Sequence, residues 1–175
     1  MDVMLDIECL GVAPDAVILT VAAIGFDPCG AELYPQHAVY HRVDTDSQPD
    51  RGIDPATVAW WANQCEAAKA EAFGEQDRVP LRQAMEQLAA LLWKASRIWA
   101  NGVTYDMTIL EHAYKGLGMP LPWKYYRVMD ARTVYKLCPA EQRLSNNHHA
   151  LQDCINQAEL LQRCFRRLNI RTLNT

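Results

Sequence analysis

A chain of 175 residues, half of them hydrophobic, is long enough to bury the core of one compact domain, and we predict a single domain over residues 1–175. Its 21 acidic residues outnumber the 17 basic ones, and the formal net charge of -4 argues against tight electrostatic binding of duplex nucleic acid. No apolar run approaches the roughly 20 residues that span a bilayer, so no membrane partner is expected.

The first third of the chain predicts three strands followed by a helix. Short apolar runs rich in Val and Ile indicate strands at residues 3–7, 16–26 and 38–43, separated by turns that contain Gly and Pro. A helix is expected to begin at Asp54-Pro55, with Asp54 as its N-cap and proline in the first turn.

The rest of the chain predicts helices that alternate with short strands. Pro80 opens a helix in which leucines and a methionine recur at helical spacing, and further helices are expected from Thr104 or Tyr105, over 131–137 and over 148–168. Residues 98–100 and 127–129 indicate two more strands. Strands first, and then strands interleaved with helices, predict an α/β domain with a mixed sheet, antiparallel early and parallel later.

Four acids carry the candidate chemistry: two on the first strand, one in the first turn of a helix and one inside the last helix. Asp6 and Glu8 lie two residues apart on the first strand, so both side chains point to one face, where they would repel each other without a cation between them. Asp106 and Asp153 are each uninformative alone, since acids in helices are usually capping or solvated. Together the four carboxylates offer the hard oxygen ligands that suit Mg²⁺ or Mn²⁺.

These acids also carry a resemblance to a known family. The opening Asp6-Ile7-Glu8-Cys9-Leu10-Gly11, the pair Tyr105-Asp106, and the stretch from His148 to Asp153 resemble, in order, the three motifs of the Asp-Glu-Asp-Asp-His (DnaQ-like) 3′–5′ exonucleases. The double tryptophan Trp60-Trp61 with Gln64, and Asn101-Gly102 before Tyr105, are similar to the branch that includes exodeoxyribonuclease VIII and the small mycobacterial-type exoribonucleases.

The resemblance implies a ribonuclease H-like fold, a five-stranded mixed sheet flanked by helices, and a phosphodiester hydrolase. Asp6, Glu8, Asp106 and Asp153 would hold two divalent cations about 4 Å apart, Mg²⁺ or Mn²⁺, and His148 would be the general base. His149 is the competing histidine, and on a helix it would point about 100° away from His148. Expected products are nucleoside 5′-monophosphates released from single-stranded 3′ ends.

Substrate contacts are expected from residues of and near the three motifs. Cys9 stands where the family usually has threonine, so a backbone contact to the terminal nucleotide would survive and a hydroxyl contact would not. Aromatic side chains are candidates for base stacking, although one of two adjacent tryptophans on a helix must face the core. The candidates are Cys9, Leu10, Trp60, Trp61, Gln64, Asn101 and Tyr105.

Several alternatives stay open at this point. The sequence does not separate DNA from RNA, with a slight lean towards DNA and an exoribonuclease as the alternative. A catalytically inactive nucleic-acid binding module and an endonuclease of the ribonuclease H kind are the competing classes. Six cysteines without a C-x-x-C pair are expected as free thiols, which fits the cytoplasm, and kinship leaves a homodimer open.

Overall fold

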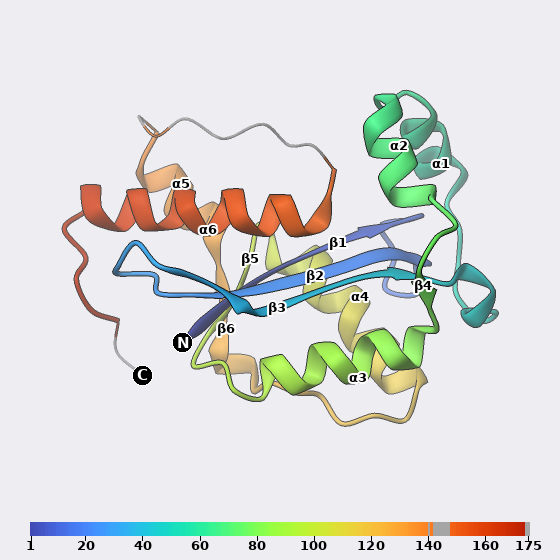
Figure 1. Cartoon of the computed structure of the whole chain (residues 1–175), viewed down its shortest axis with the longest axis horizontal. Helices are drawn as coiled ribbons and strands as arrows, with labels where there is room; N and C mark the ends of the chain where they lie inside the picture. Colours follow the sequence, from blue (N-terminus) through green and yellow to red (C-terminus); the bar gives the residue numbers. More distant parts are fainter. Residues whose placement is uncertain (140, 142–147, 174–175) are drawn as a thin grey trace.

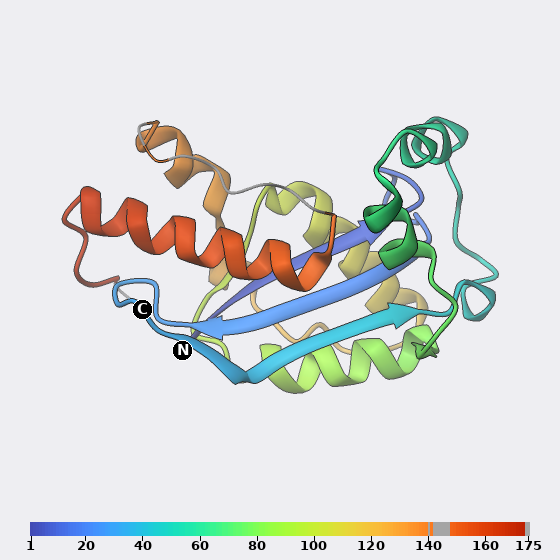
Figure 2. The ribbon, with the colours of Figure 1, turned by 45° about the horizontal axis from the view of Figure 1, so that its top comes forward.

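The computed structural model describes residues 1–139, 141 and 148–173. It consists of one twisted sheet with helices on both faces, and α6 covers one face while α3 and α4 cover the other (Figures 1 and 2). The strands are β1 (Asp2–Cys9), β2 (Ile18–Phe26), β3 (Leu33–Val43), β4 (Arg78–Val79), β5 (Ile98–Ala100) and β6 (Val128–Asp130). The helices are α1 (Pro55–Ala62), α2 (Glu66–Phe73), α3 (Leu81–Leu92), α4 (Val103–Gly116), α5 (Ala131–Leu137) and α6 (Ala150–Arg167), with 3₁₀ turns η1 (Thr45–Ser47) and η2 (Tyr125–Arg127).

The sheet is mixed, as predicted, and runs in the order β4-β3-β2-β1-β5-β6. β1, β2 and β3 pair antiparallel, whereas β5 and β6 continue from β1 in parallel. The expected number of five strands is one too few. The additional strand, β4, consists of two residues that pair in parallel with the end of β3.

The alternation of β1 decides which face of the sheet carries the acids. Val3, Leu5 and Ile7 pack with α3 and α4 in one buried cluster. Met4 points to the opposite face and packs with Cys154 and neighbouring residues of α6. Because side chains alternate along a strand, Asp6 and Glu8 follow Met4 onto the face of α6.

The helix α6 packs against the sheet through a stripe at helical spacing. Cys154, Ala158, Leu161 and Phe165 are all buried against β1, β2 and β5. Burying one leucine or phenylalanine side chain stabilises the fold by about 1.5–3 kcal/mol, so this stripe fixes the helix on the sheet. Its first turn is thereby held next to the acids of β1. In the described parts of the chain, no helix combines the length and the apolar character that crossing a membrane requires.

The candidate active site

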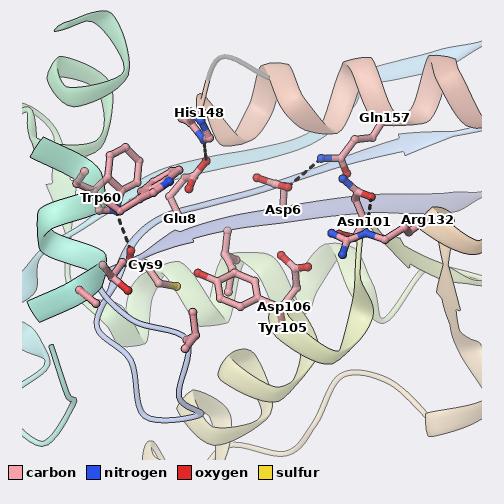
Figure 3. A pocket seen from close by; sticks show the side chains of 15 residues that line it. Asp6, Glu8, Cys9, Trp60, Asn101, Tyr105, Asp106, Arg132, His148 and Gln157 are labelled. Atoms are coloured by element: carbon pink, nitrogen blue, oxygen red, sulfur yellow. Dashed lines mark hydrogen bonds and ion pairs between the residues drawn. The ribbon is translucent and has the colours of Figure 1, made fainter. Parts of the chain in front are cut away.

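The first two carboxylates project from the last part of β1. Asp6 lies opposite Ala22 and Glu8 opposite Thr20 of the neighbouring strand β2, and the register shifts between Glu8 and Cys9. The pairing with β2 holds the backbone of both acids, so their side chains have a fixed direction (Figure 3). The short pairing of β1 with β5 ends at Met4, which leaves the neighbouring edge open at the level of the acids.

Asp153 joins these two acids from α6. It is buried in the first turn of the helix, and one carboxylate oxygen of each of Asp6, Glu8 and Asp153 lies within 4.8 Å of the others. Burial raises the pKa of Asp6 well above its usual range, and the charges of Asp106 and Glu8 raise it further. A cluster of this kind is costly without a cation, because buried like charges repel each other in a low dielectric.

Asp106 is the fourth carboxylate and lines the same cavity from the first turn of α4. It is 4% exposed, and burial raises its pKa to about 7 although backbone hydrogen bonds from Ile7 and from its own N–H oppose that shift. The donor set is therefore four carboxylates, three of them within one ion's reach. Hard oxygen ligands of this kind fit Mg²⁺ or Mn²⁺ and fit soft metals poorly.

His148 faces the acids from the segment that precedes α6. Its Nδ1 lies 3.5 Å from Oε1 of Glu8, and this hydrogen bond raises the pKa of His148, while partial burial opposes the shift. The ring of Trp60 meets the imidazole edge to face, with 4.9 Å between ring centroids. An imidazole fixed in this way beside the carboxylates has the position required to exchange a proton with a water bound there.

His148 and His149 point in different directions, but not because of the rotation between adjacent residues of a helix that we expected. α6 begins at Ala150 and not at residue 148, so neither histidine is inside the helix. His148 has a left-handed backbone with φ of 52°, and His149 is the N-cap of α6. The ring of His149 packs on Tyr40 at 5.0 Å, and its Nε2 lies 3.8 Å from Glu71, away from the cavity.

Trp60 and Trp61 have different environments although they are adjacent on α1. The side chain of Trp61 is 2% exposed, and its Nε1 donates a hydrogen bond of 3.0 Å to the carbonyl oxygen of Cys9. Trp60 is 44% exposed and covers one side of the cavity (Figure 3). Trp61 thus ties α1 to the end of β1, and Trp60 is the tryptophan available to a ligand.

The other expected contact residues divide into two groups. Cys9, Asn101 and Tyr105 line the cavity, and burial raises the pKa of both the Cys9 thiol and the Tyr105 hydroxyl, so both are neutral. Leu10 is buried in a separate apolar cluster with Trp61, and its backbone carbonyl accepts from the N–H of Asp54. Gln64 donates to the carbonyl of Trp60 at the end of α1, and neither it nor Leu10 lines the cavity.

Two residues of the site were absent from the sequence expectations. Gln157 donates from Nε2 to Oδ1 of Asp6 over 2.9 Å, while its own Oε1 is buried without a partner among the described residues. It stands four residues after Asp153, so the same helical face carries both, which is a signal that the sequence contains. Arg132 lines the cavity from the first turn of α5, and no sequence motif distinguishes it from other exposed arginines.

The cavity enclosed by these residues has a volume of about 610 Å³. This size suits a small molecule or one to two nucleotides of a single strand and is within the range of ordinary ligand sites. Its walls combine carboxylates, an imidazole and an indole, so the cavity has an acidic floor and an apolar side.

Comparison with solved structures gives the same fold at low sequence identity. The chain resembles Exonuclease X in complex with 5′ overhanging duplex DNA (TM-score 0.60, 15% identity, 97% of this chain and 93% of that one). It also resembles the Mg²⁺- and Mn²⁺-bound form of Pop2p from S. pombe (0.65, 12%, 98% and 85%) and cell-death related nuclease 4, CRN-4 (0.59, 12%, 97% and 65%). The fold is therefore ribonuclease H-like, and no curated protein sequence matches the chain.

A comparison with protein families gives a match over nearly the whole length. Residues 1–165 match the family described as the 3′-5′ exoribonuclease Rv2179c-like domain. That stretch contains all three predicted motifs, from the first acid on β1 to the start of α6, together with the cavity that they line. The chain belongs to the Rv2179c-like 3′–5′ exoribonuclease domain family, and it is an exonuclease of the hydrolase class.

Proposed function

We propose that this exonuclease depends on Mg²⁺ or Mn²⁺ and removes nucleoside 5′-monophosphates from the 3′ ends of single strands. The observation that carries the proposal is the cluster of Asp6, Glu8 and Asp153, with Asp106 in the same cavity and His148 beside it. Four buried or half-buried carboxylates have no counter-charge of comparable size among the described residues of the cavity, and divalent cations would supply it.

Each side chain has a separate part in the proposed reaction. Asp6, Glu8, Asp106 and Asp153 would hold the cations, and Gln157 would keep the carboxylate of Asp6 in its orientation through the 2.9 Å hydrogen bond. Mg²⁺ or Mn²⁺ held by these carboxylates would lower the pKa of a bound water, so that hydroxide becomes available near neutral pH, and would stabilise the negative charge on the departing 3′ oxygen. His148 would accept the proton of the attacking water.

Several features favour a single strand as the substrate. The exposed indole of Trp60 offers a stacking face, and base stacking stabilises single-stranded binding by about 1–3 kcal/mol per base without demanding a sequence. A net charge of -4 provides little electrostatic attraction for a long duplex. The 3′ terminal nucleotide would therefore stack on Trp60 next to His148.

RNA is the substrate that we propose as preferred. The description of the matching family names an exoribonuclease, whereas the sequence alone gave a slight lean towards DNA. The similar fold of Exonuclease X was solved with DNA, so DNA is the alternative that the test must include.

Cleavage of 5′-labelled strands tests the proposal. The purified protein is incubated with a single-stranded RNA and a DNA of the same sequence, with Mg²⁺, with Mn²⁺ or with chelator. Asp6→Asn and His148→Ala are compared with two matched controls, Asp50→Asn, an exposed acid outside the cavity, and His149→Ala, the neighbouring histidine. We expect a metal-dependent ladder that shortens from the 3′ end, with RNA faster, and that persists in both controls.

The outcomes separate the competing classes. Internal fragments would indicate an endonuclease, and binding without cleavage under every metal condition would indicate a binding module. A ladder that Asp6→Asn leaves intact would contradict the proposed metal site. Faster cleavage of DNA would overturn the preference for RNA and leave the mechanism in place.

Cellular location and assembly stay predictions. We expect a cytoplasmic protein for which a homodimer is an open alternative to a monomer, and light scattering coupled to size-exclusion chromatography decides between the two. A mass of 19.8 kDa in solution would contradict the dimer.

A further inference from the structure

One wall of the cavity carries a positive charge that the proposed chemistry does not use. Arg132 and Asn101 lie on the side of the carboxylates away from His148 and Trp60 (Figure 3). Asn101 follows the carboxyl end of β5, and Arg132 is the second residue of α5, which follows β6. Because β5 and β6 run in parallel, both residues reach the same edge of the sheet as the acids.

The guanidinium of Arg132 is held in place by the backbone around it. Its Nη2 donates to the carbonyl oxygen of Asn101 over 2.7 Å, and its Nε lies 3.4 Å from Oδ1 of the same residue. Gly102 has a φ of 107°, and a Cβ at this position would lie 2.9 Å from Nη2, so the turn is shaped to admit the guanidinium. Asp130 accepts from the N–H groups of Gly102 and Thr133 and thereby ties the two loops together.

Arg132 makes no direct ion pair with an acid among the described residues, although its charge acts across the cavity to lower the pKa of Asp106, which burial raises. Among the residues that the structure describes, no carboxylate lies within 4.0 Å of its guanidinium nitrogens, and its hydrogen-bond partners are neutral groups of Asn101. It is also the sole Lys or Arg among the described residues that line the cavity. A fixed, exposed guanidinium without a carboxylate partner is suited to bind an oxyanion such as phosphate.

The position of Arg132 indicates which phosphate this would be, if the proposed exonuclease function holds. The scissile phosphate belongs at the carboxylates, and the 3′ terminal nucleoside beyond it carries no other phosphate. The next negative charge on the substrate is the phosphate on the 5′ side of the penultimate nucleoside. Trp60 and Arg132 lie on opposite sides of the acids (Figure 3), so a strand with its terminal base on Trp60 and its scissile phosphate at the carboxylates would continue towards Arg132.

We propose that Arg132, oriented by Asn101, binds the phosphate immediately upstream of the scissile one. The enzyme should therefore prefer strands that carry this upstream phosphate. The cavity thereby contains two subsites, a stacking subsite at Trp60 and an anion subsite at Arg132. Cleavage of very short products would slow when the upstream phosphate is missing.

A pair of dinucleotides isolates this contact. One carries a 5′-phosphate and the other a 5′-hydroxyl, so both have the same scissile bond and only the first has the upstream phosphate. We expect the wild type to favour the phosphorylated dinucleotide in kcat/KM, and Arg132→Gln to reduce this preference by about tenfold. Lys136→Gln is the matched control, because this exposed lysine of α5 lies outside the cavity and its loss changes the net charge equally.

Binding provides a second readout that does not depend on turnover. Affinity for a fluorescent trinucleotide is measured at several salt concentrations on the inactive Asp6→Asn background, with and without Arg132→Gln. Loss of one phosphate contact should reduce the slope of log K against log[salt] by about 0.7. The slope should not change with Lys136→Gln.

The possible results can be told apart. If Arg132→Gln lowers kcat/KM equally for both dinucleotides, with or without a lower melting temperature, the assignment to the upstream phosphate is overturned. Arg132 would then contact the scissile phosphate or have a structural role. If the wild type cleaves neither dinucleotide nor longer strands, the proposed function fails, and the salt slopes still decide whether Arg132 binds phosphate.

Discussion

The same substitution, Trp to Leu, at two adjacent positions should have different effects. At Trp61 it should reduce stability, and at Trp60 it should reduce substrate binding. Trp61→Leu removes the hydrogen bond to the carbonyl of Cys9 and part of a side chain that is 2% exposed. A buried carbonyl left without a donor costs about 1–3 kcal/mol, and truncating a buried tryptophan to alanine costs about 3–5 kcal/mol, of which leucine recovers a part. We therefore expect Trp61→Leu to lower the free energy of unfolding by about 3–5 kcal/mol.

That loss is measurable as a change in melting temperature. In a protein of this size, 1 kcal/mol corresponds to about 2–4 °C, so Trp61→Leu should melt roughly 6–20 °C below the wild type. Trp60→Leu removes a ring that is 44% exposed, and its unfolding free energy should change by about 1 kcal/mol or less. Its kcat/KM on single strands should instead fall by about 5- to 150-fold, which corresponds to one lost stacking contact.

Thermal unfolding by circular dichroism and the cleavage assay at 20 °C measure the two effects on the same preparations. The reasoning is refuted if Trp60→Leu destabilises the fold as much as Trp61→Leu does. It is also refuted if Trp61→Leu has the melting temperature of the wild type but a lower activity, since Trp61 would then contact the substrate and not the end of β1.

Four further perturbations test the site and the fold. His148→Ala should reduce kcat by about 10²–10⁴-fold and leave Mn²⁺ affinity, measured by calorimetry, nearly unchanged. With chelator, Asp6→Asn should be at least as stable as the wild type, because one of three clustered like charges is gone. Mn²⁺ at 100 times its Kd should raise the unfolding free energy of the wild type alone, by about 2.7 kcal/mol. Gln157→Leu should weaken Mn²⁺ binding by about 10- to 100-fold, and unchanged affinity would contradict its role in orienting Asp6. Asp2→Ala removes the buried acceptor of Arg97 and Trp99 far from the site, and should cost about 3–5 kcal/mol in unfolding experiments without lowering kcat at 20 °C.

Most of the fold was predictable because its elements carry strong local signals. Asp54 caps α1 as expected, α5 has the expected bounds, and the buried stripes of α3 and α6 match their sequence periodicity. α2 was missed because its buried residues are Ala68 and Ala72, which are too small to produce a clear apolar stripe. β4 was missed because two residues show no alternation, and only their pairing with β3 makes them a strand.

The site was predictable in its acids and less so in the residues around them. The three motifs contain the four carboxylates that lie together in the structure. Three of them line the cavity, and Asp153 lies beside Asp6 and Glu8. The helix start was placed two residues early, because His149 accepts from the N–H of Gln152 and caps α6, so the chain turns through His148 before the helix begins. Leu10 and Gln64 belong to a motif or lie near one, but tertiary packing places both outside the cavity.

The placement of the acids also explains how the fold tolerates so much negative charge in one place. Asp106 and Asp153 both occupy the first turn of a helix, where the positive end of the helix dipole stabilises a carboxylate by about 0.3–1 kcal/mol. This gain is small beside the effect of burial, which raises the pKa of Asp106 to about 7, so the metal-free site still opposes ionisation of its own ligands. Divalent cations would reverse that balance, since they favour the ionised carboxylates and link metal binding to the stability of the end of β1. The two helix starts and Arg132 place positive charge beside the carboxylates, which favours the binding of a phosphodiester there.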